Sequence, residues 1–145
     1  MTRDRPGVCL GVDVGKVRVG VAVSDPYGIL ATPLVTLARG QGDLPRLAAL
    51  VREYEAVAVI VGLPVNLRGL EGPAAADSRN YAESLAQVIA PVPVQLSDER
   101  MSTVLASRRL SEQGVRGRRQ KAVVDQAAAV EILQVWLDSR RRRTT

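Results

Sequence analysis

The chain has 145 residues and a mass of 15.6 kDa, the length of one ordinary domain. It contains no histidine and one cysteine, which excludes imidazole catalysis, a disulfide framework and a thiolate zinc site within one chain. No apolar run approaches the roughly 18–20 residues that a membrane span requires, and we expect a cytoplasmic protein.

The net charge of +5 is concentrated in the last third of the chain. Residues 1–99 carry nine Lys and Arg against eleven Asp and Glu, whereas residues 100–145 carry eleven against four. The basic residues gather within Arg116–Lys121 and in the run Arg140–Arg143. One interpretation is a phosphate-binding surface, and the other is a solvated face followed by a frayed tail.

The first predicted elements form a β-hairpin. Val8–Asp13 and Arg18–Ser24 are typical of strands, and the residues between them, Val14-Gly15-Lys16-Val17, favour a tight turn. Leu34–Leu37 is a third short apolar stretch, which we expect to extend the antiparallel sheet. Cys9 lies in the first apolar run and is interpreted as a small core residue.

A helix and a buried strand are predicted next. Apolar residues recur at helical spacing over residues 44–51. The β-branched run Ala56–Val61 is typical of a parallel strand that is buried on both faces, and Gly62-Leu63-Pro64 ends it.

The second half of the chain contains three predicted helices and one strand. Pro73 suits the first turn of a helix that continues to about Ala90, and Val92–Leu96 is a further strand. The last two helices are predicted over about Met101–Glu112 and Ala122–Asp138. This order predicts a mixed sheet with helices on its faces, in one α/β domain.

The predicted domain covers residues 1–139. We expect residues 140–145 to form a disordered basic tail that the fold does not need.

Four acidic residues lie at positions where a ligand site is expected. Asp13 stands at the carboxyl end of the first strand, Asp98 and Glu99 follow the strand Val92–Leu96, and Asp125 lies in the first turn of the last helix. Ligands collect at the carboxyl ends of strands in open α/β sheets. Carboxylates there would suit Mg²⁺ or Mn²⁺, and one or two such ions can drive phosphodiester hydrolysis without histidine.

Each of these acids also has a local interpretation. Asp98 would cap the following helix, Glu99 and Asp125 would be first-turn residues favoured by the helix dipole, and Asp13 would belong to the turn.

Four segments of the chain resemble the motifs of the YqgF/RuvX family, in the same order. They are GVDVGKVRVGVAVSD (11–25), VGLPVNLRGLEGPAAADSR (61–79), DERMSTVLA (98–106) and VDQAAAVEILQVWLD (124–138). Members of this family are described as pre-16S rRNA nucleases and also as Holliday junction resolvases. The resemblance implies an RNase H-like fold, in which strands one to three are antiparallel and strands four and five are parallel. It also implies a cytoplasmic nuclease that uses Mg²⁺ or Mn²⁺.

By this resemblance, the catalytic and metal-binding acids fall on Asp13, Glu99 and Asp125, with Asp98 as the less favoured alternative to Glu99. The sequence departs from resolvase-like relatives at Ala128, where a second acid often stands one turn after the first. The residues expected to bind nucleic acid are Arg18, Asn66, Arg68, Arg100, Arg116, Arg118, Arg119 and Lys121. With three Tyr, one Trp and no Phe, we expect contacts to the nucleic-acid backbone to outweigh base stacking.

Three functions stay open at this point. The first is a metal-dependent nuclease that processes the 5′ end of pre-16S rRNA during ribosome biogenesis, with a pre-ribosomal particle as partner. The second is a resolvase of branched DNA, which requires a symmetric dimer. The third is a non-catalytic nucleic-acid-binding factor. The sequence leaves open whether the protein is a monomer or a homodimer.

Overall fold

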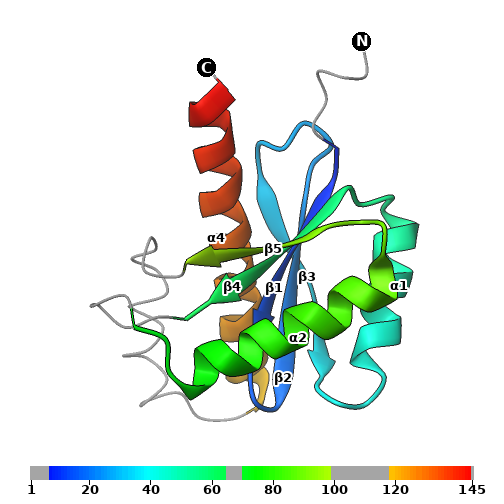
Figure 1. Cartoon of the computed structure of the whole chain (residues 1–145), viewed down its shortest axis with the longest axis vertical. Helices are drawn as coiled ribbons and strands as arrows, with labels where there is room; N and C mark the ends of the chain where they lie inside the picture. Colours follow the sequence, from blue (N-terminus) through cyan, green and yellow to red (C-terminus); the bar gives the residue numbers. More distant parts are fainter. Residues whose placement is uncertain (1–6, 65–69, 99–117, 145) are drawn as a thin grey trace.

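A five-stranded sheet with the strand order β3-β2-β1-β4-β5 forms the centre of this computed structural model (Figure 1). The structure describes residues 7–64, 70–98 and 118–144. The strands are β1 (Cys9–Val14), β2 (Arg18–Ser24), β3 (Ala31–Ala38), β4 (Ala58–Leu63) and β5 (Val94–Asp98). β1, β2 and β3 pair in antiparallel fashion, whereas β4 pairs in parallel with both β1 and β5. The mixed sheet expected from the sequence is therefore confirmed.

Helices cover both faces of this sheet. The helices are α1 (Asp43–Glu53), α2 (Pro73–Ile89) and α4 (Arg118–Thr144). α1 and α2 lie on one face and the long helix α4 crosses the other, as Figure 1 shows. Each face therefore has its own apolar core, one closed by α1 and α2 and the other closed by α4.

The alternation of side chains along β1 connects the two cores. Leu10 and Val12 pack towards α1 and α2, whereas Cys9 packs towards α4. All six residues of β4 are buried, as expected for a parallel strand with helices on both of its faces. Cys9 is fully buried, which agrees with its interpretation as a core residue.

Several element boundaries differ from the sequence-based expectation. β3 begins at Ala31 instead of Leu34, because its early residues continue the pairing with β2 through to Ser24. α2 covers Pro73–Ile89, as expected. The helix predicted over residues 101–112 lies outside the described residues.

The C-terminal part of the chain requires a correction. We expected a disordered tail from residue 140, but α4 continues to Thr144. The guanidinium carbon of Arg140 lies 4.5 Å from the centre of the Trp136 ring, and Nη1 of Arg141 donates a hydrogen bond of 2.7 Å to the Gly28 carbonyl oxygen. The first contact joins residues one turn apart in α4, and the second ties the helix to the loop at Gly28. Together they hold arginines that, in the sequence, look like a solvated run.

In the part of the chain that the structure describes, no helix is both long enough and apolar enough to cross a membrane.

Candidate active site

Asp13 is a buried carboxylate near the carboxyl end of the central strand β1. The residue is 6% exposed, and it pairs with Gly20 of β2. On the other side of β1 lies β4, whose Val61 pairs with Val12. Because β1, β4 and β5 are parallel, their carboxyl ends belong to one edge of the sheet. Asp13 thus places a buried carboxylate at the edge of the sheet where ligands collect in α/β folds.

Asp43 is the other buried carboxylate among the described residues. Its Oδ2 accepts a hydrogen bond of 2.8 Å from the Tyr81 hydroxyl group. Burial, together with this bond, raises the pKa of Tyr81 far above its ordinary value, so Tyr81 remains a neutral donor. Asp43 therefore has a structural role at the start of α1.

α4 runs antiparallel to β1. Nη1 of Arg140 lies 4.0 Å from the sulfur of Cys9, at the start of the strand. Further along β1, Gly11 is in contact with Leu133 and with the backbone of Ala129, which come earlier in the helix. The earlier turns of α4 therefore approach the end of the strand that carries Asp13.

A row of paired residues across the sheet shows which residues of α4 lie opposite Asp13. Asp13 pairs with Gly20, and Gly20 pairs with Thr36 of β3. Nε2 of Gln126 donates a hydrogen bond of 2.9 Å to the Thr36 hydroxyl group. The backbone of Asp125, next to Gln126 in the helix, thus lies at the level of Asp13. The side chain of Asp125 is outside the description.

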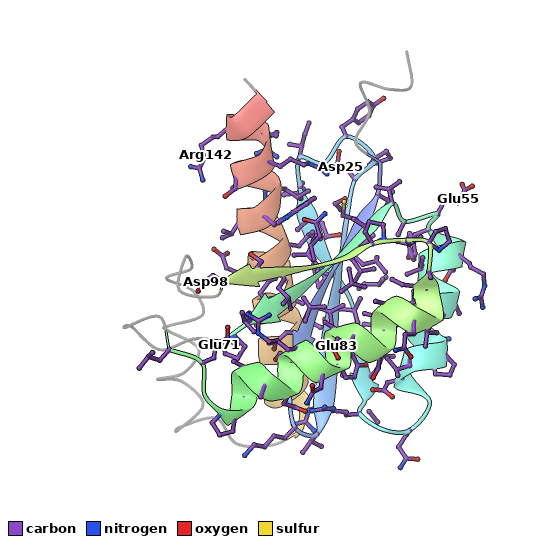
Figure 2. The ribbon with its side chains drawn as sticks, viewed as in Figure 1. Asp25, Glu55, Glu71, Glu83, Asp98 and Arg142 are labelled. Atoms are coloured by element: carbon purple, nitrogen blue, oxygen red, sulfur yellow. The ribbon has the colours of Figure 1, made fainter. Side chains whose placement is uncertain are left out.

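Asp98 ends β5 and lies beside a different part of α4. Figure 2 shows Asp98 at the end of β5. It lines a cavity of about 510 Å³ together with later residues of that helix. The helical residues in this lining are Val135, Trp136, Ser139 and Arg142. All of them follow Asp125 by ten residues or more, which is roughly 15 Å or more along the helix axis.

The described residues do not contain a complete set of metal ligands. Among the side chains that the structure describes, which do not include those of residues 118–125, no three Cys, Asp or Glu side chains form a group that suits a metal ion. Of the three expected ligands, Asp13 is described, whereas Glu99 and the side chain of Asp125 are not.

The expected nucleic-acid-binding residues are described to different extents. Arg18 is half-buried and begins β2, at the other end of the turn that follows Asp13. Arg118, Arg119 and Lys121 belong to the first turns of α4, and only their backbone is described. Four of the expected residues lie outside the described part: Asn66, Arg68, Arg100 and Arg116.

The structure adds a pair of residues that the sequence analysis missed. Nη1 and Nη2 of Arg39 donate hydrogen bonds of 2.5 and 2.7 Å to the carboxylate of Asp77 in α2. These bonds hold the pKa of Asp77 below its ordinary value. Nη1 of Arg39 also donates to the carbonyl oxygen of Gly15, two residues after Asp13, at 2.9 Å. Arg39 directly follows the third strand, but no local pattern connects it to a residue 38 positions away.

A family model and individual relatives both match nearly the whole of this chain. The sequence model of the family described as "RuvX: Holliday junction resolvase" matches residues 7–139. A protein of Mycolicibacterium smegmatis is 57% identical over 150 residues, which cover 95% of this chain and 88% of the relative. A protein of Frankia casuarinae is 59% identical over 137 residues, which cover 92% of this chain and 68% of the relative. Both carry the name "Putative pre-16S rRNA nuclease".

Comparison with solved structures supports the fold. RuvC of Thermus thermophilus in complex with a Holliday junction substrate aligns with a TM-score of 0.57 at 19% identity. The alignment covers 93% of this chain and 96% of RuvC. At this level of identity the likeness concerns the fold, and it confirms the RNase H-like architecture expected from the sequence.

Proposed function

The chain belongs to the RuvX family, and from this membership we propose that it is a nuclease that processes the 5′ end of pre-16S rRNA by hydrolysing phosphodiester bonds. Two relatives that carry the name of a pre-16S rRNA nuclease support the choice of this RNA as the substrate, since they are 57% and 59% identical to this chain over nearly its whole length. The structural observation that carries the proposal is the buried carboxylate of Asp13 at the carboxyl edge of the sheet, at the level where the backbone of Asp125 passes.

We assign the catalytic and metal-binding roles to Asp13, Glu99 and Asp125. Oxygen ligands of this kind suit Mg²⁺ or Mn²⁺, which would supply an activated water and stabilise the leaving oxygen. The contribution of Asp13 is a carboxylate with a fixed position, because its strand is paired on both sides. A carboxylate that is already ordered loses little conformational entropy when it binds a cation.

Nucleic acid is the proposed partner, bound through its phosphates by the basic residues at the start of α4 and by Arg18. α4 enters this region with Arg118, Arg119 and Lys121 in its first turns, ahead of Asp125. Such contacts position the backbone without reading sequence, and they weaken as the salt concentration rises. The proposed cellular setting is a pre-ribosomal particle in the cytoplasm.

A second candidate function is resolution of branched DNA. The description of the family and the fold shared with RuvC favour it. This function needs two active sites related by symmetry, and therefore a dimer on the junction.

Cleavage of two matched substrates tests the proposal. The substrates are an RNA with the 5′ leader of 16S rRNA and a four-way DNA junction, each incubated with Mn²⁺ or with EDTA. We expect Mn²⁺-dependent cleavage of the RNA, and a loss of about 100-fold or more in Asp13→Asn and Asp125→Asn, because each variant removes a ligand charge. Asp138→Asn is the matched control on α4 and should cleave at the parent rate.

The possible outcomes separate the candidate functions. Cleavage of the RNA alone supports the processing role, and paired symmetric nicks in the junction support the resolvase. Binding without any cleavage leaves the non-catalytic factor. Parent-level cleavage by Asp13→Asn would show that the metal site is assigned wrongly.

A further inference from the structure

The turn between β1 and β2 joins two residues of the proposed site. Asp13 precedes this turn and Arg18 follows it. The Gly15 N–H donates a hydrogen bond of 2.9 Å to the Arg18 carbonyl oxygen, which closes the turn. A Cβ atom on Gly15 would lie 2.7 Å from the same oxygen, so this close approach requires glycine.

Arg39 holds the turn at two further points. Its backbone N–H donates to the Val17 carbonyl oxygen at 2.9 Å, and its Nη1 donates to the Gly15 carbonyl oxygen at 2.9 Å. The tip of the turn has little packing of its own, since Lys16 is exposed and Val17 is 67% exposed. The two hydrogen bonds from Arg39 thus stabilise a turn that projects into solvent.

The guanidinium group of Arg39 is itself fixed from several directions. Asp77 accepts two of its hydrogen bonds in a forked arrangement, which is among the stronger and more directional polar contacts in proteins. Its central carbon lies 5.3 Å from the centre of the Tyr81 ring. Tyr81 in turn donates to the buried Asp43. This chain of contacts ties the turn to the rigid helices α1 and α2.

We propose that Arg39 is a positioning residue for the nuclease site: it holds the β1–β2 turn against α2, so that Asp13 and Arg18 keep a fixed relation to each other. The inference rests on the proposed function, because it takes Asp13 as a metal ligand and Arg18 as a phosphate contact. Placing these groups with small errors matters, since misplacement by about 1 Å can reduce a rate by about 100-fold.

A purely structural ion pair is the competing explanation, and the chain offers a matched example of one. Arg79 donates hydrogen bonds of 2.6 Å to both carboxylate oxygens of Glu71. This pair joins α2 to Glu71, which lies just before that helix in the chain (Figure 2). The Arg79 side chain is more exposed than that of Arg39, 47% against 22%, and its hydrogen bonds go to Glu71 and not to the turn. Arg79→Gln therefore removes the same kind of bond at a place where positioning of Asp13 is not at stake.

The experiment compares Arg39→Gln, Arg39→Lys and Arg79→Gln with the parent. It measures kcat, KM and the Mn²⁺ concentration for half-maximal cleavage, together with hydrogen exchange at the Gly15 amide. We expect Arg39→Gln to lower kcat by about 10- to 100-fold, to require more Mn²⁺, and to exchange the Gly15 amide faster. The amides of β4 should keep their protection.

The two comparison variants separate charge from geometry. Arg39→Lys should share the defect, because an ammonium group cannot donate to the Gly15 carbonyl oxygen and to both carboxylate oxygens of Asp77 at once. Arg79→Gln should match the parent.

Two results would overturn the inference. One is a parent-level kcat in Arg39→Gln despite fast exchange at Gly15, and the other is full activity in Arg39→Lys, which would mean that charge alone matters. Should Arg39→Gln fail to fold, Asp77→Asn replaces it and is expected to show the same changes to a smaller extent. A parent protein that cleaves nothing contradicts the proposed function instead, and the Gly15 exchange then still decides whether Arg39 holds the turn.

Discussion

Gly11 of β1 and Leu133 of α4 are so close that a Cβ atom on Gly11 would lie 2.7 Å from the Leu133 Cβ atom. The same Cβ atom would lie 2.8 Å from the Ala129 carbonyl oxygen. Gly11 precedes Asp13 by two residues, and Ala129 follows Asp125 by one helical turn. The absence of a side chain at Gly11 therefore sets how near α4 comes to the strand that carries Asp13.

Gly11→Ala should push α4 away from the sheet. We expect the free energy of unfolding to fall by about 1–3 kcal/mol, as for overpacking in a core, and cleavage to weaken because Asp125 moves with the helix. Urea denaturation measures the stability change. Gly72→Ala is the matched control, since nothing lies within 4 Å of the Cβ atom it adds. Equal stability of the two variants would contradict this account of the contact.

The carboxylate of Asp25 organises the loop between β2 and β3. It accepts hydrogen bonds from the N–H groups of Tyr27, Ile29 and Leu30, at 3.0, 2.8 and 2.7 Å. Burial alone would raise the pKa of Asp25, but these three bonds outweigh it and lower the pKa below its ordinary value of 3.8. The stabilisation is therefore complete above the unfolded-state pKa of about 4, and it is lost as the pH falls below that value.

Asp25→Asn should remove this pH-dependent contribution. We expect the parent to be more stable than the variant at pH 6, by about 1 kcal/mol, and the difference to shrink as the pH falls from 4 to 2. Urea denaturation at pH 6 and at pH 3 measures it, with Glu55→Gln as an exposed control. A difference that stays constant over this range would show that the ionised carboxylate is not what holds the loop.

The thiol of Cys9 is expected to be unreactive in the folded protein. It is fully buried, and burial raises its pKa, an effect that the neighbouring Arg140 reduces only in part. The reactive thiolate is therefore scarce and shielded. We expect iodoacetamide at pH 8 to modify Cys9 slowly in buffer and rapidly in denaturing urea, with Cys9→Ala as the control for other sites of modification. Equal rates in the two conditions would show that the core around Cys9 opens readily.

The basic residues around the start of α4 should dominate the affinity for nucleic acid. Replacing Arg116, Arg118, Arg119 and Lys121 with Gln should weaken binding to all sequences alike. It should also make the dependence of log K on log salt less steep, by up to about one unit for each lost phosphate contact. Fluorescence anisotropy over a range of KCl concentrations measures this slope. Arg46→Gln combined with Arg52→Gln, both in α1, is the control. An unchanged slope would place the binding surface elsewhere.

The sequence predicted those features that depend on local patterns. The glycine turn at Val14–Val17 and the apolar run Ala56–Val61 identified the hairpin and the buried parallel strand, and thereby the sheet. The end of α4 was missed because a run of four arginines resembles a solvated tail, whereas Arg140 and Arg141 are held by contacts with Trp136 and with the loop at Gly28.

The candidate site was predictable to a similar extent. The sequence points to Asp13 as a candidate because it stands at the end of an apolar strand, and in the structure Asp13 is buried there. The pairing of Arg39 with Asp77 was out of reach, because it depends on how α2 packs against the end of β3. The metal-binding role of Asp13, Glu99 and Asp125 remains a prediction that the cleavage experiment tests.

The placement of α4 also has a consequence for the order of events during synthesis. Its apolar side covers Cys9, Ala22, Ala31 and Ile60, which all belong to earlier strands. As the chain leaves the ribosome, one face of the sheet must therefore stay uncovered until residues 128–137 have emerged. A growing chain would accordingly expose an apolar surface, and the residues proposed for the active site would come together only when α4 docks.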